Sequence, residues 1–176
     1  MKSHEMKKQR DLSRGFKEQD EVMTRYAESR GYRWVPSSSM KDIYQKFDGT
    51  VVVADGESHR VQYKGVIHNI PRATVLFEYT SVNGGIGWGR GRSDYVVQRL
   101  EGERLFCYSR QKALDFLVER VGEPGATVPR LSPRDEKPVM QWCGRPERSD
   151  VFIHVPIAML KEHVGGGYRS IERRPQ

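Results

Sequence analysis

The pair Asp55-Gly56 stands between two runs rich in β-branched and aromatic residues, at 43–54 and 60–67. Asp-Gly between such runs is the strongest short-range signal for a β-hairpin, because glycine tolerates the positive φ that a tight turn requires. With this turn as the centre, paired residue numbers sum to about 111, and Asp48 faces the segment 60–64. The hairpin therefore fixes a strand register and excludes a purely helical bundle.

The other elements follow from periodicity and breakers. Residues 15–30 have apolar positions at helical spacing and acidic residues near their start, and Gly31 ends that helix. Residues 73–82 are predicted to be the third strand of a meander that begins with the hairpin. The remaining expected elements are two strands at 93–99 and 104–109, a helix at 110–121, and a strand with a short helix within 151–163. This order predicts the α+β class.

The length of 176 residues suits one domain. We expect that domain at residues 15–164, between a basic N-terminal arm at 1–14 and a polar tail at 165–176. Residues 122–149 are rich in proline, glycine and charge, which predicts a loop or insertion within the domain. The two cysteines, Cys107 and Cys143, are expected to be free thiols, because they are too few for a disulfide framework.

Charge and hydropathy indicate the compartment and the kind of partner. The chain has 30 Lys and Arg against 23 Asp and Glu, a net charge of +7, which favours a polyanionic partner. No run of 18 apolar residues occurs, and the N-terminus lacks the apolar segment of a signal peptide. The sequence therefore predicts a cytoplasmic protein, in a bacterium or a phage-infected host cell, with no membrane partner.

The hairpin brings chemically useful groups together. If Asp48 faces the returning strand, its carboxylate lies near the amide of Gln62, the backbone carbonyl of Tyr63 and the ammonium of Lys64. Oxygen ligands of this kind suit a hard cation such as Mg²⁺ or Mn²⁺, and Lys64 would stand beside a metal-bound water. An ordinary hairpin with a surface aspartate and lysine remains the alternative interpretation of these residues.

The pattern Asp-x(13)-Gln-x-Lys, after an acidic helix and before another strand, resembles the PD-(D/E)XK nuclease superfamily. The tripeptide Gln-Tyr-Lys is similar to the variant with glutamine in place of the usual acid, as in some group I intron homing endonucleases. The later run LFEYTSVNGGIGWGRGRSDYVVQR is similar to phage-encoded members. The resemblance implies a restriction-endonuclease-like αβββαβ core with a mixed sheet flanked by helices.

The resemblance also implies function: an Mg²⁺-dependent DNA endonuclease encoded by a phage or mobile element, acting alone or as a homodimer. Asp48, Gln62 and the Tyr63 carbonyl would hold the metal, and Lys64 would be the catalytic lysine. The acid of the first helix would be Glu21 or Glu18. The chain departs from the pattern at Phe47, where the superfamily often has proline, and at Gln62, whose neutrality weakens metal binding.

Glu78, on the next strand, could supply the missing negative charge, or it could be a strand carboxylate paired with an arginine. The neutral Gln62 favours a second hypothesis: a catalytically lapsed protein that binds nucleic acid or a host protein as a regulator or anti-defence factor.

The glycine-rich stretch 83–92 is expected to be a loop that contacts nucleic acid. Trp88 would stack on a base, and Arg90 and Arg92 would contact phosphates. Lys46 and Arg72, on either side of the hairpin, are further expected contacts. The alternative is a connector whose tryptophan packs on the domain. The glycine spacing matches neither a Rossmann fingerprint nor a P-loop, so no nucleotide cofactor is expected.

Overall fold

The structure, a computed structural model, describes residues 2–38, 45–67, 71, 73–101, 104–132 and 135–171. Its elements, in chain order, are α1 (Lys2–Glu28), β1 (Arg33–Pro36), β2 (Gly49–Val52), β3 (Ser58–Lys64), β4 (Thr74–Thr80), η1 (Trp88–Arg90), β5 (Tyr95–Arg99), β6 (Arg104–Ser109), α3 (Arg110–Val121), β7 (Val151–Pro156), α4 (Ile157–Met159), η2 (Leu160–Val164) and β8 (Gly167–Ser170). This mixture confirms the α+β class. No helix within the described ranges combines the length and apolar character needed to cross a bilayer.

The main sheet has six strands in the order β1-β2-β3-β5-β6-β8. Every neighbouring pair is antiparallel except β3 and β5, which are parallel, so the sheet is mixed. The β2–β3 hairpin forms at Asp55-Gly56, where Gly56 has a φ of +89°. Val52 pairs with Ser58 and Gly49 with Val61, a register one unit below the expected sum. The predicted hairpin is thereby confirmed.

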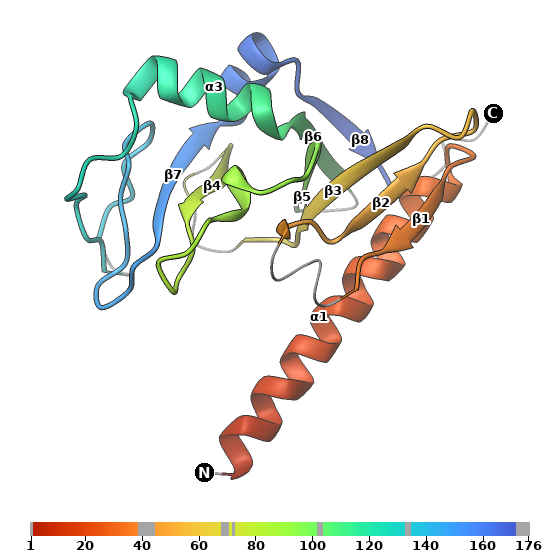
Figure 1. The fold of residues 1–176 in the computed structure, drawn as a ribbon, viewed down its shortest axis with the longest axis horizontal. Helices are drawn as coiled ribbons and strands as arrows, with labels where there is room; N and C mark the ends of the chain where they lie inside the picture. Colours follow the sequence, from red (N-terminus) through yellow and green to blue (C-terminus); the bar gives the residue numbers. More distant parts are fainter. Residues whose placement is uncertain are drawn as a thin grey trace.

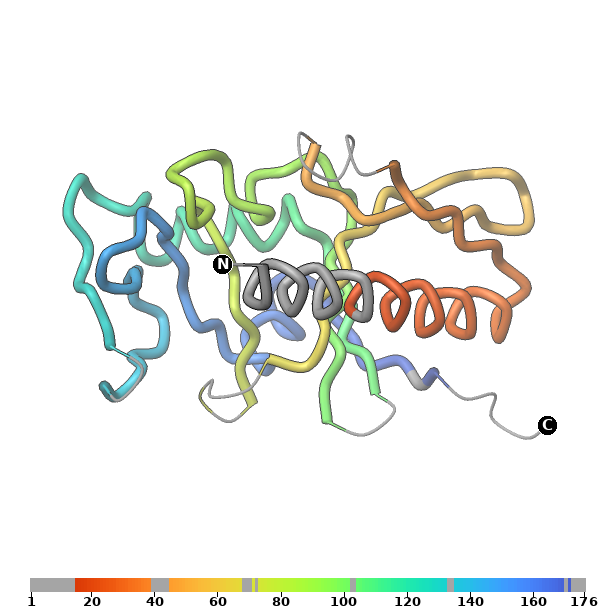
Figure 2. Tube along the Cα trace, turned by 90° about the horizontal axis from the view of Figure 1, so that it is seen from below, coloured from red at the N-terminus to blue at the C-terminus, as the bar shows by residue number. Residues whose placement is uncertain are grey.

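Helix α1 covers one face of the main sheet. Its buried residues Val22, Met23 and Ala27 pack on Val61 and Val97 in one of the two apolar cores. The helix ends at Glu28 and the chain turns at Gly31, whose φ of +73° favours glycine, and Tyr32 donates its backbone N–H to the Ala27 carbonyl. Figure 2, a view from below, shows the red-orange part of α1 lying in front of the strands. The predicted helix and its stop are confirmed.

The opposite face of the main sheet carries the second core. Phe106 and Tyr108 of β6 pack there with Leu117 of α3 and with the two-stranded sheet formed by β4 and β7. Helices therefore flank the mixed sheet on both faces, with β4 and β7 beside α3 in the second layer (Figure 1).

The expected meander is wrong in its third strand. Residues 74–80 are extended as predicted, but β4 leaves the main sheet and pairs with β7, with Val75 opposite Val155 and Phe77 opposite Ile153. The main antiparallel meander is β1-β2-β3 instead. The described connection from β3 to its parallel partner β5 runs through β4 and η1, and α3 comes after β6.

Three segments outside the expected elements belong to secondary structure or to a core. The predicted polar tail is wrong for residues 167–170, which form β8 at the edge of the main sheet, followed by the buried Ile171. Within the expected insertion 122–149, Trp142 and Cys143 are buried, and Cys143 exchanges backbone hydrogen bonds with Phe152 of β7. Residues 2–14, expected as an arm, belong to α1.

Candidate functional site

Asp48 lies immediately before β2, on the side of the main sheet that faces β4 and α3. Its backbone N–H donates to the Val61 carbonyl at 2.8 Å, which continues the hairpin register and sets Asp48 opposite Gln62. Asp48 is 7% exposed and Gln62 is 3% exposed. The sequence thus predicts correctly that this carboxylate meets the returning strand.

The Asp48 carboxylate accepts two short hydrogen bonds from β3. The Gln62 side-chain amide donates to Oδ2 at 2.5 Å, and the Tyr63 backbone N–H donates to the same oxygen at 2.6 Å. Hydrogen bonds to a charged acceptor each contribute about 1.5–3 kcal/mol, so this pair fixes the carboxylate within the sheet. In this arrangement the Gln62 amide serves Asp48 as a donor.

Lys64 follows on the same face, two residues after Gln62. Its ammonium lies 5.3 Å from the centre of the Trp88 ring, within the range of a cation–π contact. The Trp88 backbone N–H lies 3.5 Å from Oε2 of Glu78. The structure therefore brings Asp48, Gln62 and Lys64 together on the hairpin, and places Glu78 beside the tryptophan that Lys64 contacts.

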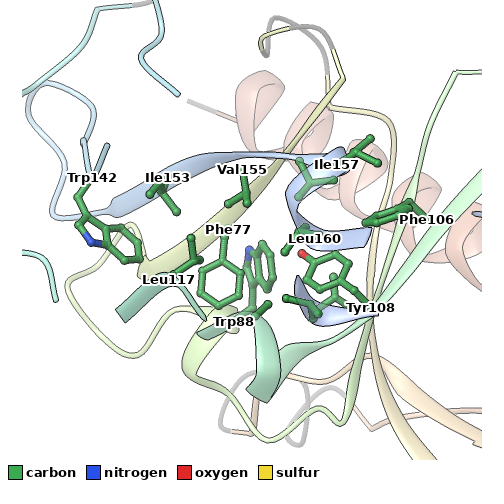
Figure 3. Close-up of a cluster of buried hydrophobic side chains, with 14 residues drawn as sticks. Phe77, Trp88, Phe106, Tyr108, Leu117, Trp142, Ile153, Val155, Ile157 and Leu160 are labelled. Carbon is green, nitrogen blue, oxygen red and sulfur yellow. The ribbon is translucent and has the colours of Figure 1, made fainter. Parts of the chain in front are cut away.

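Trp88 does not present its ring on the surface. It is 4% exposed, its ring centre lies 5.2 Å from that of Phe77, and Figure 3 shows its indole in the middle of the second core. The expected stacking of Trp88 on a base is corrected accordingly, since its ring packs on the domain. Trp88 contributes to the site through the contact of its ring with the Lys64 ammonium.

Arg110 fastens the loop that carries Trp88. From the first turn of α3, its guanidinium donates to the Ser93 carbonyl at 2.7 Å and to the Gly89 carbonyl at 3.2 Å. Burial lowers the pKa of this arginine, and the nearby Asp94 carboxylate opposes that shift. Arg110 thus ties α3 to both sides of the 91–92 segment. Local sequence patterns give no signal for this role.

Gly89 is a point of close approach between that loop and β4. A Cβ at Gly89 would overlap the Phe77 ring and lie 2.6 Å from the Glu78 carbonyl oxygen. We expect Gly89→Ala to lower the free energy of unfolding by about 1–3 kcal/mol, the usual cost of overpacking. Gly85→Ala is the matched control, because its Cβ would meet only Ser81 Oγ at 3.5 Å. Urea denaturation measures both, and equal stabilities would contradict the prediction.

The expected nucleic-acid contacts are dispersed. Arg90 lies 4.5 Å from the centre of the Tyr79 ring, and both line a groove of about 460 Å³ with Glu119 of α3. Arg92 is exposed, and its backbone N–H donates to the Gln45 carbonyl, next to Lys46. Arg92 and Lys46 thus stand near Asp48, whereas Arg90 stands beside carboxylates of α3. Arg72 lies outside the described residues.

The acids of α1 are on the other side of the sheet. Glu21 is exposed and pairs with Lys17 at 3.8 Å, and Glu18 pairs with Arg99 at 2.6 Å. Because α1 packs on the face formed by Val61 and Tyr63, neither acid shares the face of Asp48. The expected contribution of Glu21 or Glu18 to the site is corrected by this arrangement.

Two further residues border the site. Asp94 accepts from the Arg60 guanidinium at 2.8 Å and from the Arg60 backbone N–H, which outweighs the effect of burial and holds the pKa of Asp94 below its usual value. Gln98, directly opposite Lys64 on β5, is 1% exposed and donates to the Gly65 carbonyl at 2.7 Å. Sequence reasoning missed Gln98, although a glutamine within an apolar strand is a usable signal.

The donor set fits a hard cation only in part. Asp48 supplies one carboxylate, and the Gln62 amide oxygen could join it after the amide turns, which the broad terminal torsion of glutamine allows. In the described part of the chain, no three His, Cys, Asp or Glu side chains gather as a metal cluster. A cation here would rest on one charged ligand plus neutral oxygens, including the carbonyl of Tyr63.

Comparison with known proteins adds no relative to these observations: no family model, no curated protein and no solved structure matches the chain.

Proposed function

We propose that the protein is a metal-dependent endonuclease that hydrolyses DNA phosphodiester bonds. The observation that carries the proposal is the convergence of Asp48, Gln62 and Lys64 on one face of the β2–β3 hairpin. A carboxylate that can hold a cation near an ammonium suits metal-assisted phosphodiester hydrolysis, and the net charge of +7 favours a polyanionic substrate.

Each residue has a distinct task in this proposal. Asp48 and the oxygens of Gln62 and Tyr63 hold Mg²⁺ or Mn²⁺, which when bound would lower the pKa of a coordinated water and screen the phosphate. Lys64, held against Trp88, orients the water or stabilises the charge that develops on the phosphate. Arg92 and Lys46 attract the DNA backbone near Asp48. Glu78, whose carboxylate lies near the Trp88 backbone N–H, supplies further negative charge.

We also propose that the fold descends from the PD-(D/E)XK nuclease superfamily. Helices on both faces of a mixed sheet and a β2–β3 hairpin bearing Asp-x(13)-Gln-x-Lys are consistent with a PD-(D/E)XK-type core from a phage or mobile element. The route from β3 to β5 through β4 and η1 departs from the αβββαβ order, so the motif residues carry this inference more than the topology does.

A specific observation also favours the second candidate function, a catalytically lapsed protein that binds nucleic acid or a host protein. The Gln62 amide donates to Asp48 at 2.5 Å and thereby satisfies the carboxylate without a cation. In that case the hairpin would only stabilise the fold, and basic surface residues would bind the nucleic acid or host protein.

Incubating the purified chain with Mg²⁺ or Mn²⁺ separates the two candidates. The substrates should be supercoiled, linear, single-stranded and branched DNA, with EDTA as the metal-free control. The endonuclease proposal expects nicking or cutting that EDTA abolishes. The absence of cleavage on all four substrates would refute it, and retained DNA binding would then support the lapsed form.

A further inference from the structure

An exposed tyrosine stands at the edge of the main sheet, three strands away from Lys64 of the candidate site. Tyr168 of β8 is 44% exposed, and its ring packs edge-on against Phe106 with the ring centres 5.4 Å apart. This contact fixes the ring, because Phe106 is fully buried and Tyr168 pairs with it in the β6–β8 register. Figure 1 shows β8 beside β6 at the end of the sheet.

Two cations lie over this ring. The Arg104 guanidinium lies 5.9 Å from its centre and the Lys161 ammonium lies 5.3 Å from it. Both side chains are exposed, and among the described residues no carboxylate oxygen lies within 4 Å of either charge. Glu162, next to Lys161 in the chain, has its carboxylate near His163 instead, at 3.9 Å.

Tyr95 shows that this arrangement is particular to Tyr168. Tyr95 is 41% exposed on the same sheet, but its ring packs against His59, and the adjacent Arg60 is neutralised by Asp94. In contrast, the ring of Tyr168 contacts two cations, and neither cation pairs with a carboxylate among the described residues. A single nucleic-acid strand can bind here if a base stacks on the exposed ring in place of a cation while the cations pair with phosphates, because bases stack on aromatic rings and phosphates pair with cations.

We propose that Tyr168, Arg104 and Lys161 form a second contact for single-stranded nucleic acid. The proposal rests on the proposed function for the class of partner only, and it does not require cleavage. Lys64, Gln98, Phe106 and Tyr168 occupy successive paired positions across β3, β5, β6 and β8. Three strand spacings of about 4.8 Å, or about 14 Å, separate Lys64 from Tyr168. The buried side chains of Gln98 and Phe106 lie between them, so a strand that reaches both places must pass around the second core.

The test measures binding of the full chain to a fluorescein-labelled oligothymidylate of about 20 nucleotides in EDTA, by fluorescence anisotropy. Tyr168→Leu should weaken binding about 5- to 100-fold, as expected for the loss of one stacking contact, and Tyr168→Phe should restore it. Tyr95→Leu is the matched control and should bind like the original protein. The double change Arg104→Gln and Lys161→Gln should reduce the dependence of log K on log salt by about 1 to 2.

The outcomes distinguish this proposal from the nuclease proposal. If Tyr168→Leu binds the oligonucleotide as well as Tyr95→Leu does, the second contact is refuted, whether or not the protein cuts DNA. If the effect is equally large on a duplex of the same length, stacking on a single strand is refuted and a general polyanion surface takes its place. Loss of binding in Tyr168→Leu without any cleavage by the original protein supports the contact and refutes the nuclease.

Discussion

Replacing Lys64 with methionine is expected to reduce DNA cleavage by about 10²- to 10³-fold, the usual cost of removing one preorganised charge that stabilises the transition state. The ammonium of Lys64 lies on the face of Asp48 and Gln62 and is held 5.3 Å from the Trp88 ring centre. Methionine keeps the length of the side chain, and its sulfur packs well against an aromatic ring. The expected loss is therefore in kcat, and the free energy of unfolding should change by less than about 1 kcal/mol.

Lys17→Met is the control for this experiment. Lys17 is an exposed lysine of α1, 80% exposed in its side chain, on the helix that covers the opposite face of the sheet. The Lys17→Met variant loses the same charge as Lys64→Met and should cleave DNA like the original protein. If Lys64→Met and Lys17→Met cleave equally well, Lys64 has no catalytic role and the proposed site is refuted.

The local part of the fold could be predicted from the sequence because it depends on neighbours in the chain. The Asp55-Gly56 turn fixes its own register, and that register carries Asp48 to Gln62 without any long-range information. Helix α3 matches its predicted range of 110–121, with Ser109 accepting from the Lys112 backbone N–H as its N-cap. In both cases the determining contacts lie within about 15 residues of each other along the chain.

The partner of β4 could not be predicted in the same way. Its alternation of buried residues, Val75 and Phe77, requires a covered face but does not specify which strand lies alongside. The strand that pairs with it, β7, begins at Val151, so this choice depends on packing between distant segments. The order of strands in the chain favours a continuation of the meander, and tertiary packing overrides it.

Of the two interpretations of the glycine-rich loop, the structure agrees with the connector whose tryptophan packs on the domain, and the glycines explain why the sequence alone leaves both open. A Cβ at Gly87 would lie 2.5 Å from the Glu78 carbonyl oxygen, and Gly89 meets the Phe77 ring. These glycines therefore allow the loop to lie directly on β4 and press the indole into the core. The strand in the tail is also hard to predict, since the one aliphatic residue there, Ile171, follows β8 and is a weak signal for a buried segment.

The second large effect is expected from Gln62→Glu, which restores the acid that the PD-(D/E)XK pattern usually has. In the original chain the Gln62 amide donates to Asp48 at 2.5 Å. A carboxylate in its place cannot donate, and two like charges about 4 Å apart repel by about 4 kcal/mol at an effective dielectric constant near 20. Without metal, Gln62→Glu should therefore unfold at a distinctly lower temperature than the original protein.

Metal should reverse this loss, because a divalent cation between two carboxylates turns repulsion into coordination. At a Mn²⁺ concentration about 100 times the dissociation constant, binding stabilises the folded state by about 2.7 kcal/mol. Differential scanning fluorimetry with Mn²⁺ or EDTA measures the effect, and any cleavage by Gln62→Glu should saturate at lower metal than in the original.

Gln98→Glu is the matched control for the metal effect. It also buries a new carboxylate, on the same face of the sheet and opposite Lys64, but away from Asp48. Whatever its stability without metal, it should not gain stability in Mn²⁺, since one carboxylate opposite the Lys64 ammonium does not form a divalent site. If Mn²⁺ stabilises Gln62→Glu no more than Gln98→Glu, Asp48 and position 62 do not share a cation. The hairpin would then be structural, because the metal that the nuclease proposal requires has no other buried carboxylate on this hairpin face to bind, within the described residues.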